Sequence, residues 1–394
     1  MSKLRLGVIG IGSMGSGHSK SIIDGKCPEI ELSAVCDINP ARLDWAKEAA
    51  PQAARFDNAA QMMESGLIDA VLIAVPHYGH VPFAIQAFEH GLHVLCEKPA
   101  GVYTKQVREM NRAADASGKI FALMYNQRTD HIYRKMHEIV QSGELGAIRR
   151  TNWIITDWYR PQAYYNSGGW RATWAGEGGG VLLNQSPHQL DLWQWICGMP
   201  VTVRAELSFG KWHDIEVEDD VTAFVTYENG ATGTIITTTA DFPGSNRFEI
   251  AFDGGKLVAE HGKLTMWRLA QTITDFSKVN KIPLGHPEFE RIEVETDGQN
   301  EQHVGVLNAF AGAILHGTPL IADGREGING LMISNAMHLS AWQNKVVHLP
   351  LESADEEAFY EELIKRAGVD PNEKFLQTKT DKSEYFPFEL KVNA

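Results

Sequence analysis

The chain has 394 residues, 43% of them hydrophobic and 22% charged, which is ordinary for a soluble globular protein. A formal net charge of -14 argues against nucleic acid or an anionic membrane as the main partner. The four cysteines are spaced like neither a disulfide framework nor a zinc site, so no metal is expected. No apolar run approaches the ~20 residues that span a bilayer, and no cleavable leader precedes the first apolar run, so we expect a cytoplasmic protein.

The first 125 residues alternate between short apolar runs and stretches with helical periodicity. Continuous apolar runs separated by helices are typical of a parallel sheet covered on both faces. We therefore predict an α/β domain with a doubly wound parallel sheet over residues 1–125. Its expected strands are the runs 4–10, 31–37, 69–76, 93–99 and 120–126.

The sequence changes in character after about residue 150. A polar and aromatic stretch covers 153–178, and alternating segments follow whose turns, ENG and DGG, are typical of hairpins in an antiparallel sheet. A helical region is expected over about 303–345. Because the length favours two domains, we divide the chain into 1–125, 126–350 and a C-terminal extension, 351–394, to which no function is assigned.

A glycine-rich turn, GIGSMG (residues 10–15), follows the first expected strand and opens a helix. An acid, Asp37, ends the next expected strand 22 residues after Gly15. This context matches the dinucleotide fingerprint: the first glycine permits the turn, the second lets backbone approach the pyrophosphate, and the third packs helix on strand. The phosphates are then expected at the positive end of the helix.

Asp37 is expected to accept hydrogen bonds from the adenosine ribose, which favours NAD over NADP. A 2′-phosphate beside it would face like charge, an interaction on the order of 4 kcal/mol per pair of unit charges at ~4 Å and a dielectric near 20. Arg42, five residues further on, could soften this preference, although a solvated position on a helix is the simpler interpretation. We predict NAD as the cofactor.

Two further stretches carry reactive side chains. Lys98, in CEKP (96–99), follows the strand run at 93–96, and ligands of open α/β sheets bind beyond such strand ends. Asn184 and His188 are four residues apart, so a helix would place them on one face. These side chains are candidates for the chemistry.

These motifs together resemble the Gfo/Idh/MocA oxidoreductase family. The resemblance extends over roughly residues 3 to 350. It implies an N-terminal Rossmann domain, a C-terminal α/β domain with an open, mainly antiparallel sheet, and an enzyme for sugars or polyols with a tightly held nicotinamide cofactor. It also implies a homodimer or homotetramer formed through that sheet. The resemblance is carried by the glycine turn, Glu97-Lys98-Pro99, the Gly178-Gly179-Gly180 run that leads to His188, MYNQR (124–128), and the segments 217–235 and 307–327.

Pro187 allows two arrangements of the segment around His188. One is a continuous helix from about Gly180 that kinks at the proline; the other is a new helix capped by Ser186, with Gln189 completing a capping box. We expect the continuous, kinked helix, because the resemblance implies it.

By position, the resemblance implies that Lys98 is the catalytic lysine and His188 the catalytic histidine. The family usually has Asp where this chain has Asn184, and an amide carries neither a proton nor a charge at neutral pH, so Asn184 is expected to orient the substrate by hydrogen bonds. We expect His188, with an unperturbed pKa of about 6.5, to act as general base, and Lys98 to stabilise the alkoxide, although the two roles can be exchanged. Asp191 either supports the histidine or lies elsewhere on the helix.

The remaining candidates come from the family positions and from an aromatic stretch, residues 156–174. Seven of the ten tryptophans fall between 153 and 212, and aromatic faces suit the C–H surfaces of sugars. His77 and His80 are expected either to line the site or to cap the next helix. Expected cofactor contacts are Gly10, Gly12, Ser13, Met14, Gly15, Asp37, Val75, Pro76, His80, Glu97, Lys98, Asn126, Trp170 and Arg171. Expected substrate contacts are Lys98, Tyr125, Trp158, Tyr159, Arg160, Tyr164, Tyr165, Asn184 and His188.

The leading functional prediction is an NAD-dependent oxidoreductase acting on the CH–OH group of a sugar, a polyol or a sugar derivative. Arg160 and Arg171 leave open a substrate that is acidic. One alternative is a glycoside hydrolase that oxidises its substrate transiently, eliminates the aglycone, hydrates and reduces again, so that NAD is recycled. A second alternative is a dinucleotide-binding sensor without turnover, against which the presence of both Lys98 and His188 argues.

Overall fold

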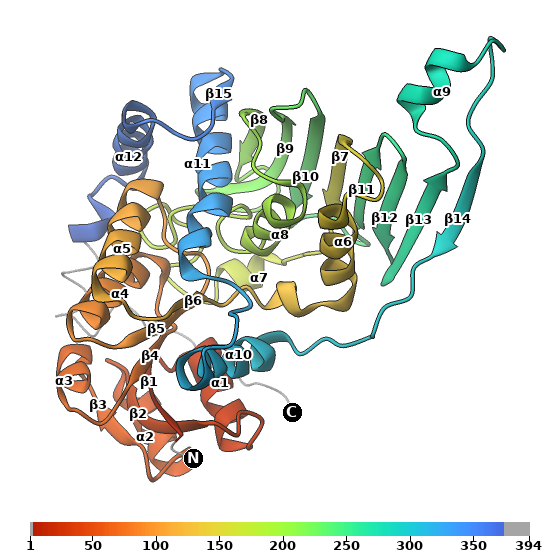
Figure 1. Ribbon diagram of the computed structural model, residues 1–394. Helices are drawn as coiled ribbons and strands as arrows, with labels where there is room; N and C mark the ends of the chain where they lie inside the picture. Colours follow the sequence, from red (N-terminus) through yellow and green to blue (C-terminus); the bar gives the residue numbers. More distant parts are fainter. Residues whose placement is uncertain (1–2, 374–394) are drawn as a thin grey trace.

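The computed structural model describes residues 3–373, and two β-sheets organise them (Figure 1). The first is a parallel sheet of six strands in the order β3-β2-β1-β4-β5-β6. The predicted doubly wound fold is confirmed, and the short strand β3 was not predicted. The strands are β1 (Leu4–Ile9), β2 (Ile30–Cys36), β3 (Ala54–Phe56), β4 (Ala70–Ile73), β5 (His93–Cys96) and β6 (Phe121–Leu123).

Helices cover both faces of this sheet, which is why its strands are continuous apolar runs. One apolar core joins the strands to α3 (Ala59–Glu64), α4 (His80–Glu89) and α5 (Thr104–Ser117). The other core joins them to α1 (Ser13–Ile23), α2 (Pro40–Ala49) and α10 (Gln302–His316). The helix α10 therefore packs on the first sheet although it lies far along the chain (Figure 1). The proposed domain limits stay a prediction.

The second sheet has nine strands in the order β14-β13-β12-β11-β7-β10-β9-β8-β15. Only β7 and β10 run parallel; the other neighbours are antiparallel, and hairpins turn at the predicted ENG and DGG sequences. The mainly antiparallel sheet is thus confirmed. Its strands are β7 (Ile148–Ile155), β8 (Thr202–Phe209), β9 (Glu218–Thr226), β10 (Thr232–Thr238), β11 (Asn246–Phe252), β12 (Gly255–Glu260), β13 (Lys263–Leu269), β14 (Phe289–Glu293) and β15 (Val347–His348).

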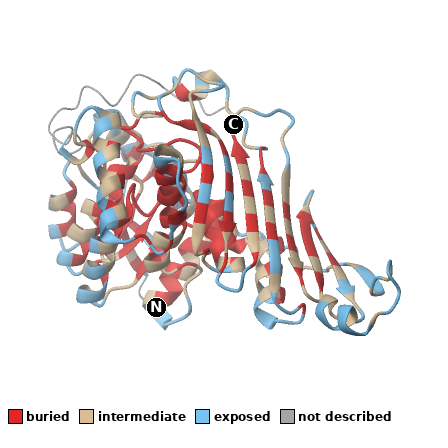
Figure 2. Cartoon of the chain, turned by 90° about the horizontal axis from the view of Figure 1, so that it is seen from above, coloured by how far each residue is buried: buried red, intermediate tan, exposed pale blue. Residues whose placement is uncertain are grey.

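Buried and exposed residues alternate along these strands (Figure 2), as expected for a sheet with one packed face. On the packed face lie α6 (His131–Ser142), α8 (Pro187–Cys197) and α11 (Gly327–Gln343), whose apolar side chains share the core with the strands. The opposite face carries exposed side chains such as Ile154 and Phe224. The helix α12 (Ser353–Ala367) packs against α5 and α11, and short elements complete the fold: η1 (His77–Gly79), η2 (Asn126–Thr129), α7 (Gln162–Tyr165), α9 (Ile273–Val279) and η3 (Gly324–Glu326).

The expected continuous helix from about Gly180 is wrong. The helix α8 begins at Pro187, and the preceding residues form turns because they are tied to the start of β9: the carboxylate of Glu218 accepts hydrogen bonds from the amides of Gly180 and Leu182, at 2.8 and 3.0 Å. Proline suits the first position of a helix, where its missing N–H has no partner to lose. The alternative arrangement is correct in its starting point but not in its cap.

Ser186 stands at the N-cap position of α8, but its hydroxyl pairs with Thr237 Oγ1 at 2.9 Å instead of capping the helix. The Oε1 of Gln189 is buried without a hydrogen-bond partner within residues 3–373, so the capping box of the alternative arrangement is absent there.

Within residues 3–373, no helix combines the length and the apolar character that crossing a membrane requires. The cytoplasmic location stays a prediction. Residues 374–394 of the expected C-terminal extension lie outside the described residues.

Candidate active site

A cavity of about 700 Å³ lies beyond the carboxyl ends of the central parallel strands. Three parts of the chain line it: the glycine turn, the segments that follow β2, β4 and β5, and the aromatic stretch together with Asn184. Ligands of doubly wound sheets bind at this edge. The cavity is therefore the candidate active site.

The glycines of the turn have three different surroundings. Gly10 has φ +83°, a conformation that L side chains rarely adopt, and a methyl group on Gly15 would lie 1.9 Å from the carbonyl oxygen of Gly10. A methyl group on Gly12 would meet no described atom within 4 Å, because that position opens toward the cavity. Gly12 is also the N-cap of α1, whose first turn has no side-chain cap among the described residues. This combination fits a phosphate group at the helix N-terminus.

Asp37 lies at the rim of the same turn and is 9% exposed. Its Oδ2 accepts a hydrogen bond from the amide of Ile11 and its Oδ1 one from Asn39, both at 2.8 Å. Burial raises the pKa of Asp37, and these two hydrogen bonds oppose that shift. Each carboxylate oxygen has a second lone pair, so Asp37 can support the turn and still accept ribose hydroxyls.

Glu97 brings a buried negative charge next to Lys98. His18 Nε2 lies 2.7 Å from Glu97 Oε1, and the amide of Lys98 donates to Oε2 at 3.1 Å. Burial alone would raise the pKa of Glu97, but the hydrogen bond from His18 and the nearby positive charges lower it to about 2. The ring of His303, from α10, meets His18 edge-on at 5.2 Å.

Lys98 reaches from the first sheet to the segment that precedes α8. Its Nζ donates to the backbone oxygen of Asn184 at 2.8 Å. Burial lowers the pKa of Lys98, while the carboxylates of Glu97 and Glu177 act in the opposite direction.

His188 lies close enough to Lys98 for the charge of the lysine to act on the imidazole. Burial, followed by the charge of Lys98, lowers the pKa of His188 to about 3, so the imidazole is neutral at pH 7. Its Nδ1 is buried and has no hydrogen-bond partner in the part of the chain that the structure describes. The ring of Tyr125 stands edge-on to it at 6.3 Å.

Asn184 lines the cavity and is paired with a buried acid, Glu177. The Nδ2 of Asn184 donates to Glu177 Oε1 and lies 3.3 Å from the hydroxyl of Tyr164. The other carboxylate oxygen of Glu177 accepts from the amide of Ala172 at 2.6 Å. Burial raises the pKa of Glu177 to about 7.

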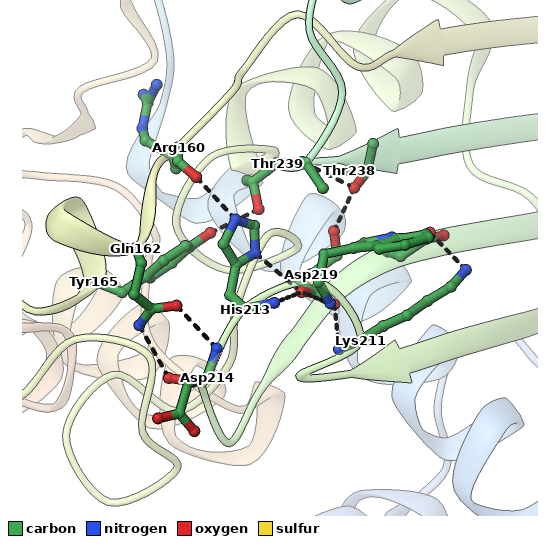
Figure 3. A network of polar contacts seen from close by, with 12 residues as sticks. Arg160, Gln162, Tyr165, Lys211, His213, Asp214, Asp219, Thr238 and Thr239 are labelled. Carbon is green, nitrogen blue, oxygen red and sulfur yellow. Dashed lines mark hydrogen bonds and ion pairs between the residues drawn. The ribbon is translucent and has the colours of Figure 1, made fainter.

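The aromatic stretch is fixed to the ends of β9 and β10 by a polar network (Figure 3). His213 bridges the buried carboxylate of Asp219, at 3.0 Å, and the backbone oxygen of Arg160, at 2.9 Å. The hydroxyl of Tyr165 lies 2.6 Å from Thr239 Oγ1. These contacts position the side chains of the stretch that reach the cavity: Tyr164, Trp170 and Arg171.

Two profiles of one family match the chain in succession. The profile described as "Oxidoreductase family, NAD-binding Rossmann fold" matches residues 4–125, and "GFO/IDH/MocA C-terminal domain" matches residues 133–258. Together they cover more than half of the sequence. The chain belongs to the Gfo/Idh/MocA family. The resemblance is thereby confirmed, and NAD is confirmed as the cofactor at the level of the family.

Relatives of this Gfo/Idh/MocA protein include dehydrogenases of polyols and sugars. The Rhizopine catabolism protein MocA of Rhizobium meliloti is 29% identical over 51% of this chain and 60% of its own length. Inositol 2-dehydrogenase of Corynebacterium glutamicum is 28% identical over 58% of this chain and 66% of its own length. These alignments therefore span about three fifths to two thirds of the curated relatives.

Among solved structures, the WlbA dehydrogenase of Bordetella pertussis, in complex with NADH and UDP-GlcNAcA, is similar throughout. It is 25% identical, with a TM-score of 0.74, over 89% of this chain and all of the WlbA chain.

Most of the cofactor contacts predicted for the Gfo/Idh/MocA protein line the cavity. They are Gly10, Gly12, Ser13, Met14, Asp37, Val75, Pro76, His80, Glu97, Lys98, Trp170 and Arg171. Gly15 packs α1 on the turn instead, and Asn126 hydrogen-bonds Gln302. His77 and His80 both line the cavity, and neither of them caps α4. The roles of all these residues stay predictions.

The predicted substrate contacts divide into three groups. Lys98, Tyr164 and Asn184 line the cavity, whereas Tyr125, Tyr165 and His188 are buried and are not among the residues that line it. Tyr159 is 43% exposed and meets the ring of Phe242, and Trp158 lies under the guanidinium of Arg160.

The sequence analysis did not identify several buried polar residues around the site. Glu177, His18 and Asp219 are the clearest cases; only Glu177 carried a local signal, as an acid within the glycine run before Asn184. The role of Asp191 was left open. Asp191 pairs with Arg128 through two hydrogen bonds of 2.6 and 2.7 Å, and within residues 3–373 no contact between Asp191 and His188 is recorded.

Proposed function

We propose that this Gfo/Idh/MocA protein is an NAD-dependent oxidoreductase that acts on a CH–OH group of a sugar, a polyol or a sugar derivative. The observation that carries the proposal is one cavity that joins the glycine turn and Asp37 to Lys98 and Asn184. A dinucleotide bound along the turn would extend toward the lysine, where an alcohol could meet it.

When bound, NAD supplies the acceptor for the hydride. The N-terminus of α1 would hold the pyrophosphate, and Asp37 would accept the ribose hydroxyls. Because Gly12 has no side chain, the pyrophosphate has space to approach the backbone there.

Lys98 is the base that accepts the hydroxyl proton of the substrate. His188 has a pKa of about 3, so protonating it beside Lys98 is costly, and this favours the exchanged roles. Lys98, whose pKa is lowered by burial, takes the proton as a neutral amine, and the ammonium that forms is stabilised by Glu97 and Glu177. The neutral imidazole of His188, which is buried next to Lys98, orients the hydroxyl.

The lining of the cavity supports a carbohydrate, with an acidic group as a further possibility to test. The lining includes the aromatic side chains Tyr164 and Trp170. The guanidinium groups of Arg160 and Arg171 both lie over the ring of Tyr164, at 5.1 and 4.6 Å, and both positive charges act on Lys98. This concentration of positive charge favours a substrate that carries a carboxylate or phosphate.

The test is a panel of polyols, neutral sugars, uronic acids and nucleotide sugars, with NADH formation followed by absorbance. Stoichiometric NADH formation on at least one member supports the proposal. Absence of NADH with every member contradicts it, and cleavage of aryl glycosides with catalytic NAD would instead support the hydrolase.

Assembly through the open face of the nine-stranded sheet belongs to the same proposal. Exposed Ile154 and Phe224 on that face support it. The molar mass in solution, by light scattering, tests it: a dimer or tetramer is expected, and a monomer contradicts it.

A further inference from the structure

We propose that Glu177 is a positioning residue, which fixes the side-chain amide of Asn184 so that its Oδ1 faces the cavity and accepts a hydrogen bond from a substrate hydroxyl. The inference rests on the proposed function, because it concerns how the same cavity recognises an alcohol. It also explains how an amide can work at a position where the family usually has a carboxylate.

The buried contacts of Glu177 determine which end of the amide it holds. Glu177 is 2% exposed and does not line the cavity, whereas Asn184 does. An ionised carboxylate only accepts hydrogen bonds, so the group that faces it must be the NH₂ of Asn184. The contact of Nδ2 with Glu177 Oε1 has this polarity.

All the other polar atoms of Asn184 except Oδ1 also have partners. The second hydrogen of Nδ2 is directed to the hydroxyl of Tyr164, at 3.3 Å. The backbone oxygen accepts from Lys98 Nζ, and the backbone amide donates to Gly180 at 2.9 Å. Within residues 3–373, Oδ1 is the one polar atom of Asn184 without a recorded partner.

This arrangement has a consequence for specificity. An acceptor at the cavity wall binds a hydroxyl and disfavours an ether or carbonyl oxygen, which would leave two acceptors facing each other. The substrate position that meets Asn184 must therefore carry a free hydroxyl, and an O-methyl analogue at that position should bind poorly.

Protonation of Glu177 would reverse the arrangement. A protonated Glu177 can donate to Oδ1, which turns the amide and presents Nδ2 to the cavity. Arg171, and Lys98 when it is protonated, face Glu177 and favour its ionised form, whereas the ring of His77 contacts the backbone oxygen of Glu177. Since the pKa of Glu177 is about 7, substrate binding should strengthen as pH rises through that value.

Glu177→Gln provides a sharp test, because the amide of Ala172 determines how glutamine must lie. That amide needs an acceptor, so the Gln oxygen stays on Ala172 and its NH₂ faces Asn184. Asn184 must then turn its Oδ1 to the glutamine and present Nδ2 to the substrate. The double variant Glu177→Gln/Asn184→Asp restores an acceptor at the cavity, because the aspartate accepts from the glutamine and keeps one oxygen free.

We expect Glu177→Gln to lower kcat/KM by on the order of 100-fold, since misplaced groups cost about this much, and to remove the pH step near 7. The double variant should recover at least tenfold of the loss, while NADH affinity stays within a few-fold in both. Glu228→Gln, at an exposed acid in the turn between β9 and β10 that does not line the cavity, is the matched control and should resemble the wild type. An unrecovered double variant, or an unchanged Glu177→Gln enzyme, overturns the inference.

A thermal-unfolding cycle gives a readout that needs no substrate. Asn184→Asp alone places two carboxylates together and should lower the unfolding temperature, whereas the double variant should restore it. If the double variant is no more stable than Asn184→Asp, the two side chains do not interact as described and the inference fails. If the wild type forms no NADH on the panel but the cycle shows rescue, the proposed function fails and the pairing stands.

Discussion

The two halves of the cavity are built in different ways. The half formed by the glycine turn uses backbone amides, a helix N-terminus and Asp37, all within the first 37 residues. The half that faces Lys98 uses side chains from loops, and these are fixed by buried acids such as Glu177 and Asp219. Under the proposed function, the comparison teaches that binding of the dinucleotide depends on local backbone shape, whereas substrate recognition depends on contacts between distant segments.

The largest effect is expected from a change at Lys98, which lies where the two halves of the cavity meet. This change should affect turnover but not the binding of NADH. Lys98→Met removes the amine while keeping much of the side chain's volume, so turnover should fall by about 10²- to 10⁴-fold, the usual range for a proton-transfer group. NADH affinity, measured by fluorescence titration, should change by no more than a few-fold. Turnover at the wild-type level would show that Lys98 is not the group that takes the proton.

Gly12 and Gly15 offer a comparison within the first half. Gly12→Ala meets no described atom, so stability should be kept, but the methyl group enters the space of the pyrophosphate. Such crowding typically costs 1–3 kcal/mol, which corresponds to a loss of about 5- to 150-fold in NADH affinity.

Gly15→Ala is the contrasting variant, because its methyl group would collide with the oxygen of Gly10. It should lower the free energy of unfolding by more than about 1 kcal/mol. Denaturant titration of both variants checks this difference, and equal losses of stability would contradict the account of the turn.

Asp37→Ser tests the choice between the two dinucleotides. The change removes a charged acceptor, worth about 1.5–3 kcal/mol, so kcat/KM for NAD should fall by about tenfold or more. Activity with NADP should rise because the like charge is gone and Arg42 lines the same cavity. Steady-state kinetics with both cofactors measures the ratio, and an unchanged preference for NAD would show that Asp37 does not make it.

The smallest effect is expected in the second half, at the network of Figure 3. Asp219→Asn turns an acceptor of four hydrogen bonds into a group that must also donate, which should cost about 1–3 kcal/mol of stability. The aromatic stretch then loosens, so KM for the sugar should rise several-fold while NADH affinity is unchanged. Asp220→Asn, at the neighbouring and less buried acid, is the matched control.

The same contrast explains what the sequence could predict. The parallel sheet, the glycine turn and Asp37 were predictable because each depends on a short local pattern. The choice between the two arrangements of the segment before α8 was not, because Glu218 lies far along the chain and holds the amides of Gly180 and Leu182. The short strand β3 was missed because three residues give too little periodicity to detect.

The site followed the same division. Lys98, Asn184 and His188 could be named from motif positions, but the acids that set their orientation and charge could not. Glu177 and Asp219 act through contacts with loops, and such contacts cannot be predicted from the spacing of residues along the chain. The pKa of His188 also depends on its burial beside Lys98, so the sequence alone favoured the imidazole as the base.

A crystal structure of the full chain with NAD and the sugar identified from the panel tests the central claim most directly. The account predicts that the pyrophosphate lies at the N-terminus of α1, and that the reacting hydroxyl lies within hydrogen-bonding distance of both Lys98 Nζ and the His188 ring. A sugar bound elsewhere, or a nicotinamide ring directed away from Lys98, would contradict it.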